Sequence, residues 1–244
     1  ALAVGVCGHS MWNVPSGRRS PDRINVTFPC CESIKPMTEI DASQVSWQDQ
    51  YKLMVGSVTP RPIALVTTLG PDGPNAAPFS FFNAIGSDPA MLMFSVGDRS
   101  GQDKDTVRNI RETPEFVVHI VSDAIKEKMN VCAVDYPFGV NELEKAGFTA
   151  LPSRKVKPPR IAEAPVAMEC RLMQIVEMGR KPYHVVFGEV VFFHYHDGIV
   201  NERFHVDVGA VNPVGRLAGK GGYCRVTDRF EMPRIALQGK PSAE

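Results

Sequence analysis

Residues 75–96 read NAAPFSFFNAIGSDPAMLMFSV, and this order of residues is typical of a β-rich fold. The stretch places three phenylalanines before a Ser-Asp-Pro turn at residues 87–89 and then enters an apolar run typical of a buried strand. A segment made only for a core would be apolar, and one made only for solvent would be charged. Residues 80–83 (SFFN) are neither. They indicate a strand that lies along a flat, partly polar molecule.

The segments on either side carry strand signals with helical segments inserted between them. Because neighbours on a strand face opposite sides, Phe81 and Phe82 cannot both point into one core. About half a dozen strands without regular β-α-β alternation favour a mainly β barrel or sandwich over a doubly wound sheet. Strands are predicted at 61–70, 77–85, 90–97, 115–122, 166–178 and 184–198, and helices at 46–54, 104–113, 122–133 and 141–147. Ser46 and Ser122 are predicted to cap the helices that begin there, and Gly147 to end its helix in the left-handed conformation.

Composition limits the classes of function. The 244 residues fit one domain with extensions, and 43% hydrophobic residues can fill a substantial core. Lys plus Arg and Asp plus Glu number 27 each, so net charge gives no argument for nucleic acid or an anionic membrane surface. The six cysteines form no C-x-x-C pair, no run is apolar enough to span a membrane, and ALAVGVCG does not resemble a signal peptide. We therefore expect a cytoplasmic protein.

The chain divides into three parts by local pattern. Residues 1–36 lack any helix or strand period, and we expect an N-terminal extension that is disordered or loosely packed, with an arm that packs on a partner subunit as the alternative. Residues 37–234 carry the ordered pattern and form the predicted domain. Residues 235–244 are predicted to be a mobile tail.

A candidate anion site lies in RSGQDKDTVRNI, residues 99–110. A helix N-terminus offers unpaired N–H groups and partial positive charge, which a nearby lysine and hydroxyl can complete. From this segment alone, however, simple N-capping by Asp105 with a solvated Lys104 is the favoured interpretation. The candidate residues are Arg99, Ser100, Lys104, Asp105 and Thr106.

The other motifs in the sequence give weaker evidence for a function. GRLAGKGG at 215–222 departs from the P-loop spacing, and no G-x-G-x-x-G follows a strand. His194 and His196, with His205 further on, have a spacing that can ligate a metal in a β-barrel. Because HYHDG approaches a turn, where histidines usually face water, we predict no metal site. No hydrolase nucleophile elbow is present.

An extended strand through residues 80–85 could hydrogen-bond the edge of a planar heterocycle while its aromatic neighbours cover one face of the ring. Upstream, Arg61, Thr67 and Thr68 could meet a phosphate or a ribityl chain. This combination favours one wall of a flavin site.

Residues 57–233 resemble the flavin reductase-like family of FMN-binding split barrels. The resemblance implies a Greek-key split β-barrel that is mainly β with inserted helices, and FMN bound near or within a homodimer interface. It rests on TPRPIALVTT, NAAPFSFFNAIGSDPAMLMFS, KDTVRNI, ELEKAGFTALPS, PRIAEAPVAMEC and FGEVVFFH.

Carried over by position, the resemblance implies a cofactor site and a catalytic residue. His184 falls close to the family's histidine near the nicotinamide, although the local spacing differs. The residues predicted to line the flavin ring are Ser80, Phe81, Phe82, Asn83 and Ala84; those for the ribityl phosphate are Arg61, Arg99, Ser100, Lys104, Asp105 and Thr106, with Thr67 and Thr68 on the strand beneath the flavin.

The implied function is an NAD(P)H-dependent FMN reductase-like oxidoreductase that takes NAD(P)H as cosubstrate. Some relatives are the reductase partners of monooxygenases, so such a component is an expected partner. The alternative is a non-enzymatic FMN carrier or electron-transfer flavoprotein of the same fold. No nucleic acid or membrane partner is expected.

Overall fold

The structure is a computed structural model that describes residues 36–99 and 101–233. The chain forms two units, divided between Gln44 and Val45. The described part of the first unit contains one short 3-10 helix, η1 (Ala42–Gln44), and all other elements belong to the second unit. Residues 1–35 of the predicted extension, Ser100 and the predicted tail lie outside the described residues.

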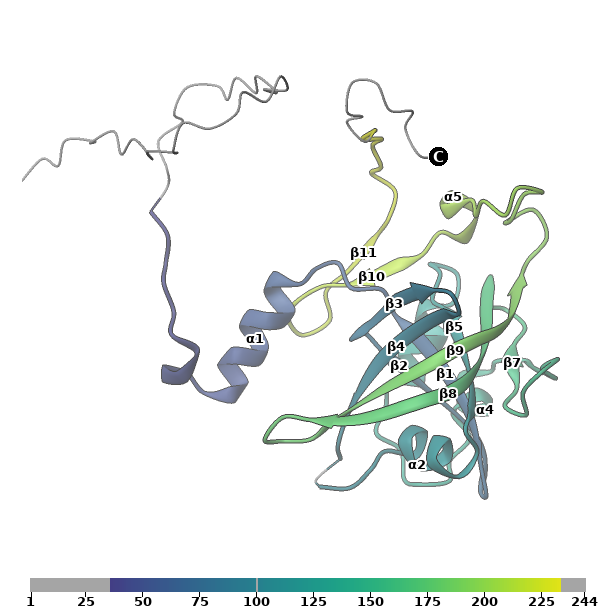
Figure 1. The fold of residues 1–244 in the computed structure, drawn as a ribbon, viewed down its shortest axis with the longest axis horizontal. Helices are drawn as coiled ribbons and strands as arrows, with labels where there is room; N and C mark the ends of the chain where they lie inside the picture. The colour runs from purple at the N-terminus through teal and green to yellow at the C-terminus, as the bar shows by residue number, and fades with distance from the viewer. Residues whose placement is uncertain (1–35, 100, 234–244) are drawn as a thin grey trace, which may run out of the picture. The chain divides into compact units, whose positions relative to one another are not determined.

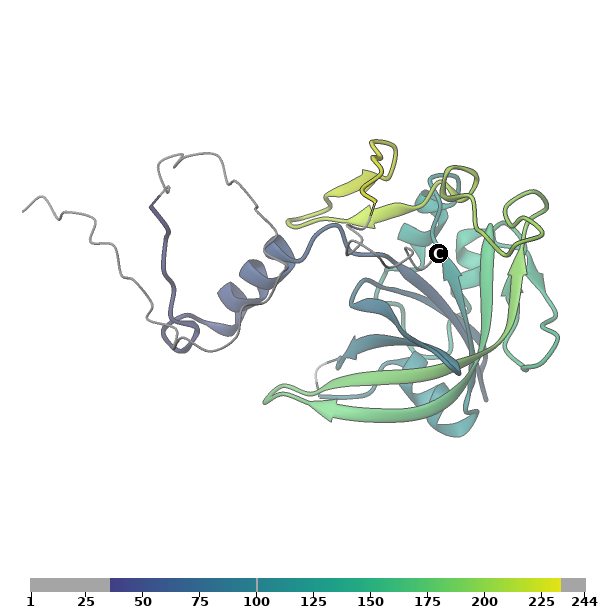
Figure 2. The same ribbon diagram turned by 45° about the horizontal axis from the view of Figure 1, so that its top comes forward.

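A seven-stranded antiparallel sheet forms the body of the second unit (Figure 1). The long hairpin of its two longest strands reaches beyond the others in both views (Figures 1 and 2). In spatial order the strands are β2 (Gly73–Phe79), β1 (Ala64–Gly70), β5 (Glu115–Ile120), β8 (Val166–Met178), β9 (Tyr183–Tyr195), β4 (Ala90–Gly97) and β3 (Phe82–Ser87).

Within the described ranges no helix is long and apolar enough to cross a membrane. The second unit also contains five α-helices and two small two-stranded sheets in its described part. They are α1 (Trp47–Ser57), α2 (Asp105–Glu112), α3 (Lys126–Val131), α4 (Glu142–Ala146), α5 (Val208–Val211), β6 (Ala150–Leu151) paired with β7 (Arg160–Ile161), and β10 (Val214–Arg216) paired with β11 (Tyr223–Arg225).

The local helix signals have mixed outcomes. Ser46 caps α1 as predicted, since its hydroxyl accepts the Asp49 N–H at 3.2 Å. Gly147 ends α4 in the left-handed conformation, with φ of 65°, also as predicted. The prediction that Ser122 caps a helix is wrong: α3 begins at Lys126, and the Ser122 carbonyl accepts the Ile125 N–H in the turn before it.

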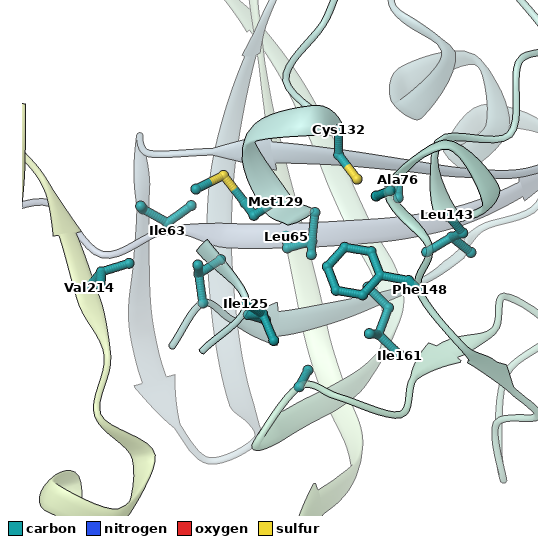
Figure 3. Close-up of a cluster of buried hydrophobic side chains, with 13 residues drawn as sticks. Ile63, Leu65, Ala76, Ile125, Met129, Cys132, Leu143, Phe148, Ile161 and Val214 are labelled. Atoms are coloured by element: carbon teal, nitrogen blue, oxygen red, sulfur yellow. The ribbon is translucent and has the colours of Figure 1, made fainter. Parts of the chain in front are cut away.

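The apolar strand β1 is buried on both faces. Ala64 and Val66 pack into the interior cluster around Phe94 and Phe116, while Leu65 packs on the other side. Figure 3 shows this second cluster, in which Leu65 lies among side chains from β2, α3, α4 and β7. Burial on both faces explains why the sequence of β1 is almost continuously apolar rather than alternating.

The predicted strand through residues 77–85 is interrupted. β2 ends at Phe79 and β3 begins at Phe82, and these two strands lie at opposite edges of the sheet. Ser80 and Phe81 form the link between them, where the Phe81 carbonyl accepts the Ser95 N–H at 2.8 Å. The expectation of one extended strand was wrong because the chain bends at Ser80 and Phe81 as it leaves the edge strand β2 and enters the edge strand β3.

A buried carboxylate holds the proline-rich crossing at residues 152–159 against the sheet. Glu169 on β8 is completely buried, and its oxygens accept the N–H groups of Arg154, Lys155 and Val156 at 2.6, 2.6 and 3.2 Å. His194 Nε2 lies 2.6 Å from Glu169 Oε1. The polar crossing is thus held by side chains rather than by a strand ladder, and Glu169 accepts three of its N–H groups while Glu115 accepts the N–H of Lys157.

The buried imidazole of His119 makes folding pH-dependent. Its Nδ1 donates to the Leu65 carbonyl and its Nε2 accepts the Ile161 N–H, both at 2.9 Å, which requires the neutral ring. Burial lowers the pKa of His119 from 6.5 to about 4. The unfolded chain therefore takes up this proton first as pH falls, and the stability contributed by the neutral ring is lost between these values.

Because of His119, we expect the free energy of unfolding to fall by about 2 kcal/mol when the pH is lowered from about 7.5 to about 5. His119→Gln, which can still donate and accept, should be less stable than the wild type at the higher pH but lose less on acidification. Urea unfolding at both pH values measures this difference. His205→Gln on an exposed loop is the control, and equal losses in the wild type and His119→Gln would contradict the prediction.

Candidate functional site

Three adjoining pockets form a groove along one side of the sheet. The α2 pocket, of about 110 Å³, lies at the N-terminus of α2, and the Ser80 pocket, of about 230 Å³, shares Pro78, Phe79 and Lys104 with it. The Trp47 pocket, of about 330 Å³, shares Tyr51, Phe81, Gly97, Asp98 and Tyr183 with the Ser80 pocket. The groove thus runs from a helix N-terminus to a cluster of aromatic rings.

The α2 pocket has the chemistry of an anion site. Lys104 occupies the N-cap position of α2 without a side-chain cap, so the first N–H groups of the helix have no capping side chain. Arg99 lines the same pocket and donates to the carbonyls of Tyr136 and Asp135. Lys104 Nζ lies 3.5 Å from Asp135 Oδ1, a partly exposed pair of little strength. Two cations and a helix N-terminus therefore face one small pocket.

A buried hydrogen-bond network forms the floor of the α2 pocket. Asn75 on β2 donates to Glu142 Oε2 at 2.9 Å and accepts the Thr106 hydroxyl at 3.2 Å. Thr68 lies 3.4 Å from the same Asn75 oxygen and accepts from Asn109 at 3.0 Å. Since Thr68 can satisfy Asn75, the Thr106 hydroxyl is able to turn its proton toward a bound anion.

Two carboxyl groups beside this pocket are held closer to neutrality than usual. Burial raises the pKa of Glu142, which also accepts the Ala76 N–H at 3.1 Å on the oxygen that accepts Asn75. Burial likewise raises the pKa of Asp105, although Arg108 opposes this shift. Burial thus favours the neutral form of Glu142, which would repel a bound anion less than its carboxylate does.

Aromatic rings line the Ser80 pocket around Phe81. Its ring centroid lies 6.5 Å from that of Tyr51 on α1 and 6.1 Å from that of Tyr183 on β9. Phe82, the next residue, packs on the interior cluster instead, which confirms that the two phenylalanines face opposite sides. The link between β2 and β3 therefore places Phe81 in the groove, and the start of β3 places Phe82 in the core.

Of the four predicted site residues Thr67, Thr68, Asn83 and Ala84, only Thr68 lies next to a pocket of the groove. Thr68 belongs to the network beneath the α2 pocket, whereas the completely buried Thr67 donates to the Pro159 carbonyl at 2.5 Å. Asn83 and Ala84 lie exposed on the edge strand β3, where the Asn83 side chain accepts the Ala84 N–H, and neither lines the three pockets. Residue alternation explains why Thr67 and Thr68 face different surroundings.

Arg61 is buried and supports the groove from behind. Its guanidinium donates to the carbonyls of Val55 and Val58 at 2.7 Å and of Leu217 at 3.2 Å. The same group lies 5.9 Å from the centroid of the Phe81 ring. Arg61 therefore joins the end of α1, the segment after β10 and the aromatic wall.

His184 lies beneath the groove rather than along it. Tyr183 lines two of the pockets, and because side chains alternate on β9, His184 points to the other face, where it is buried. Its Nε2 is 2.9 Å from Glu177 Oε1 and 3.1 Å from Asp103 Oδ1. Asp103 immediately precedes the N-cap of α2, so His184 contacts the segment that shapes the α2 pocket.

Several residues that line the groove were not predicted from the sequence. Trp47 and Tyr51 on α1, Tyr183 and Lys181 near the tip of the β8–β9 hairpin, and Glu142 on α4 lie far from residues 75–106 in sequence. No local motif marks them. Only the i, i+4 spacing of the two α1 aromatics, which places both on one face of the helix, gives a signal.

The alternative metal set is dispersed. His194 binds Glu169, as described above, and His196 Nε2 lies 2.9 Å from the Ala162 carbonyl. In the part of the chain that the structure describes, no three His, Cys, Asp or Glu side chains gather in a group that could hold a metal ion.

The chain is similar to known proteins in both sequence and structure. Residues 55–211 match the family model of the flavin reductase like domain. Component B of nitrilotriacetate monooxygenase from Bacillus cereus is 33% identical, with a TM-score of 0.78 over 81% of this chain and 100% of that one. The 2-nitrobenzoate 2-nitroreductase of Pseudomonas fluorescens is 39% identical, with a TM-score of 0.74 over 85% and 100%.

A split-barrel protein from Shewanella frigidimarina shares the fold at 18% identity, with a TM-score of 0.69 over 79% of this chain and 96% of that one. Together with the antiparallel sheet, this similarity confirms the predicted mainly β split barrel with inserted helices.

Proposed function

Since the chain belongs to the flavin reductase-like family, we propose that it is an FMN-binding oxidoreductase that accepts hydride from NAD(P)H and passes electrons onward. The observation that carries the proposal is the continuous groove from the cationic α2 pocket to the aromatic Ser80 pocket. The α2 pocket suits a phosphate and the Ser80 pocket suits a planar ring. FMN likewise has a phosphate at one end and a planar isoalloxazine ring at the other. A flavin is the cofactor that the family implies.

In this proposal the α2 pocket binds the phosphate of FMN. Arg99 and Lys104 supply charge-assisted hydrogen bonds, and the N–H groups at the start of α2 complete the site. Thr106 contributes its hydroxyl when Thr68 satisfies Asn75. Ser100 stays a prediction for this role, while the carbonyl partners of Arg61 favour a supporting role for that residue.

The Ser80 pocket then receives the isoalloxazine ring. Ser80 and the neighbouring backbone offer polar groups to the ring edge, and Phe81 and Tyr183 cover apolar ring surface. The donor set fits: the pocket adjoins the cations of the α2 pocket through Lys104 and contains aromatic rings and hydroxyl groups at the other end. Asn83 and Ala84 on the exposed edge strand stay predictions for contacts with the ring.

The bound flavin would supply the hydride-accepting chemistry. The protein's own residues hold the phosphate, orient the ring and keep it beside the Trp47 pocket, where another molecule can approach. His184 does not line the groove, so we propose that it acts through Asp103 as a positioning residue for the start of α2.

We also propose that the working form is a cytoplasmic homodimer. The exposed apolar side chains of Leu53 on α1 and Ile85 on the edge strand β3, neither of which lines the groove, support a second copy as partner. The names of the two similar enzymes support two electron acceptors, a flavin-using monooxygenase component or a nitroaromatic acid.

Glu142 gives a test of the phosphate assignment. In Glu142→Gln the amide oxygen can still accept from Asn75 and Ala76 while the negative charge beside the proposed phosphate is removed. At about pH 8 we expect FMN to bind about 3- to 10-fold more tightly than to the wild type. Because the Glu142 pKa is raised, the wild-type carboxyl neutralises earlier on acidification, and the advantage should shrink toward about pH 5.

Titrations of FMN and riboflavin with both proteins at both pH values measure this effect. Riboflavin lacks the phosphate and serves as the control ligand. An equal gain in affinity for both ligands, or a gain that does not depend on pH, would contradict the electrostatic explanation.

The proposed function is tested by adding FMN to the purified protein, desalting it and recording a visible spectrum, followed by NAD(P)H oxidation with free FMN. Retained flavin bands and turnover are the expected results. Retained flavin without turnover with either nicotinamide would favour a carrier or electron-transfer protein. Neither retention nor turnover would overturn the proposal.

A further inference from the structure

The Trp47 pocket has no role in holding FMN in the proposed function. Of the three pockets of the groove, it is the largest, and its volume of about 330 Å³ is in the range of small-molecule sites, roughly 300–1,000 Å³. It adjoins the Ser80 pocket through shared residues, so a molecule bound there would lie next to the flavin ring. Its lining residues are Trp47, Gln50, Tyr51, Met54, Phe81, Gly97, Asp98, Lys181 and Tyr183.

Aromatic side chains from three separate segments form the walls of this pocket. Trp47 and Tyr51 come from α1, Phe81 from the link between β2 and β3, and Tyr183 from β9. Trp47 is 59% exposed and Tyr51 is 50% exposed, which is costly for large rings unless another molecule covers them. Gly97 has no side chain, and a Cβ there would lie 3.3 Å from the Tyr183 ring, so its absence keeps the wall flat.

The pocket contains two charged side chains, Lys181 between β8 and β9 and Asp98 just after β4. Lys181 Nζ lies 4.7 Å from the centroid of the Trp47 ring, and among the described residues no carboxylate forms an ion pair with it. Asp98 is already engaged, because its Oδ2 accepts the Gly101 N–H at 2.7 Å. A cation beside an exposed indole and away from any carboxylate partner suits a ligand that has both a planar ring and a negative group.

We propose that the Trp47 pocket binds a small aromatic carboxylate, with its ring among Trp47, Tyr51 and Tyr183 and its carboxylate on Lys181. This inference deepens the proposed function, on which it rests for the position of the flavin, by naming the class of electron acceptor and the residues that select it. Lys181 then sets the preference for acids over neutral rings of the same shape. The aromatic walls select planar over aliphatic acids.

The test uses the full chain loaded with FMN and calorimetric titration with 2-nitrobenzoate and the neutral nitrobenzene. We expect Lys181→Gln to bind 2-nitrobenzoate about tenfold more weakly than the wild type, with nitrobenzene affinity unchanged. Trp47→Leu should weaken the binding of both ligands, since it removes the shared ring contact. Lys145→Gln, an exposed lysine on α4, is the matched control and should behave as the wild type.

Flavin absorbance of each sample separates this inference from the proposed function. Retained FMN without 2-nitrobenzoate binding would overturn the pocket assignment and leave the flavin proposal standing. Equal weakening of both ligands by Lys181→Gln would also overturn it, because the carboxylate would then not be on Lys181. Protein that retains no FMN fails the flavin proposal, and the same titrations on the flavin-free chain still decide whether the pocket binds the acid.

Discussion

Lys104→Ala is expected to weaken FMN binding by about 10- to 40-fold while leaving riboflavin affinity unchanged. A charge-assisted hydrogen bond to phosphate is worth about 1.5–3 kcal/mol, and the partial exposure of Lys104 favours the lower half of that range. The substitution removes only a weak ion pair with Asp135 from the protein itself. Fluorescence titration of FMN and riboflavin measures the two affinities.

Lys145→Ala on α4 is the matched control for loss of an exposed lysine, and its FMN affinity should equal that of the wild type. Adding Arg99→Ala to Lys104→Ala should weaken FMN binding further, because both cations face the same pocket. The assignment of the phosphate to this pocket fails if Lys104→Ala changes FMN and riboflavin affinity to the same extent.

Glu169→Ala is expected to lower the free energy of unfolding by about 3–5 kcal/mol. The change removes the acceptor of three backbone N–H groups and of His194, so one buried and three partly buried donors lose their partner. For a chain of this size each kcal/mol corresponds to about 2–4 °C, so the midpoint of thermal unfolding should fall by about 6–20 °C. Thermal and urea unfolding followed by circular dichroism measure both quantities.

Glu169→Gln should have a smaller effect than Glu169→Ala, because the amide oxygen still accepts N–H groups of the crossing. The NH2 group cannot accept, so part of the loss remains. Glu112→Ala at the exposed end of α2 is the control and should change stability by less than about 0.5 kcal/mol. A loss in Glu169→Ala no larger than this control would show that the crossing at residues 152–159 is held by other contacts.

Local sequence determined the elements of this protein well where their signals are short-range. The capping residues Ser46 and Gly147 mark the boundaries of α1 and α4 because a cap involves atoms within a few residues of each other. The long strands β8 and β9 were likewise predicted, at residues 166–178 and 184–198. The family resemblance, carried by motifs spread over residues 57–233, identified the split barrel and assigned the candidate cations Arg99 and Lys104 to a phosphate.

The candidate site depended on contacts that local signals do not contain. Whether Thr67 or Thr68 reaches the α2 pocket is decided by which face of β1 is covered by which layer, and His184 lies beneath the groove because Tyr183 takes the face toward it. Arg61 has the residue type of a phosphate ligand, but the carbonyls that surround it come from α1 and from the segment after β10.

The sequence by itself therefore determined the strands, the caps and the chemical types present. The tertiary structure decided which of these types meet, bringing Glu142, Tyr183 and Lys181 to residues 75–106 from distant segments. The physical reason is that hydrogen bonds within a turn or cap act between near neighbours in the chain. The walls of a groove, in contrast, are built from side chains that become neighbours only when the sheet closes and both faces of its strands are buried.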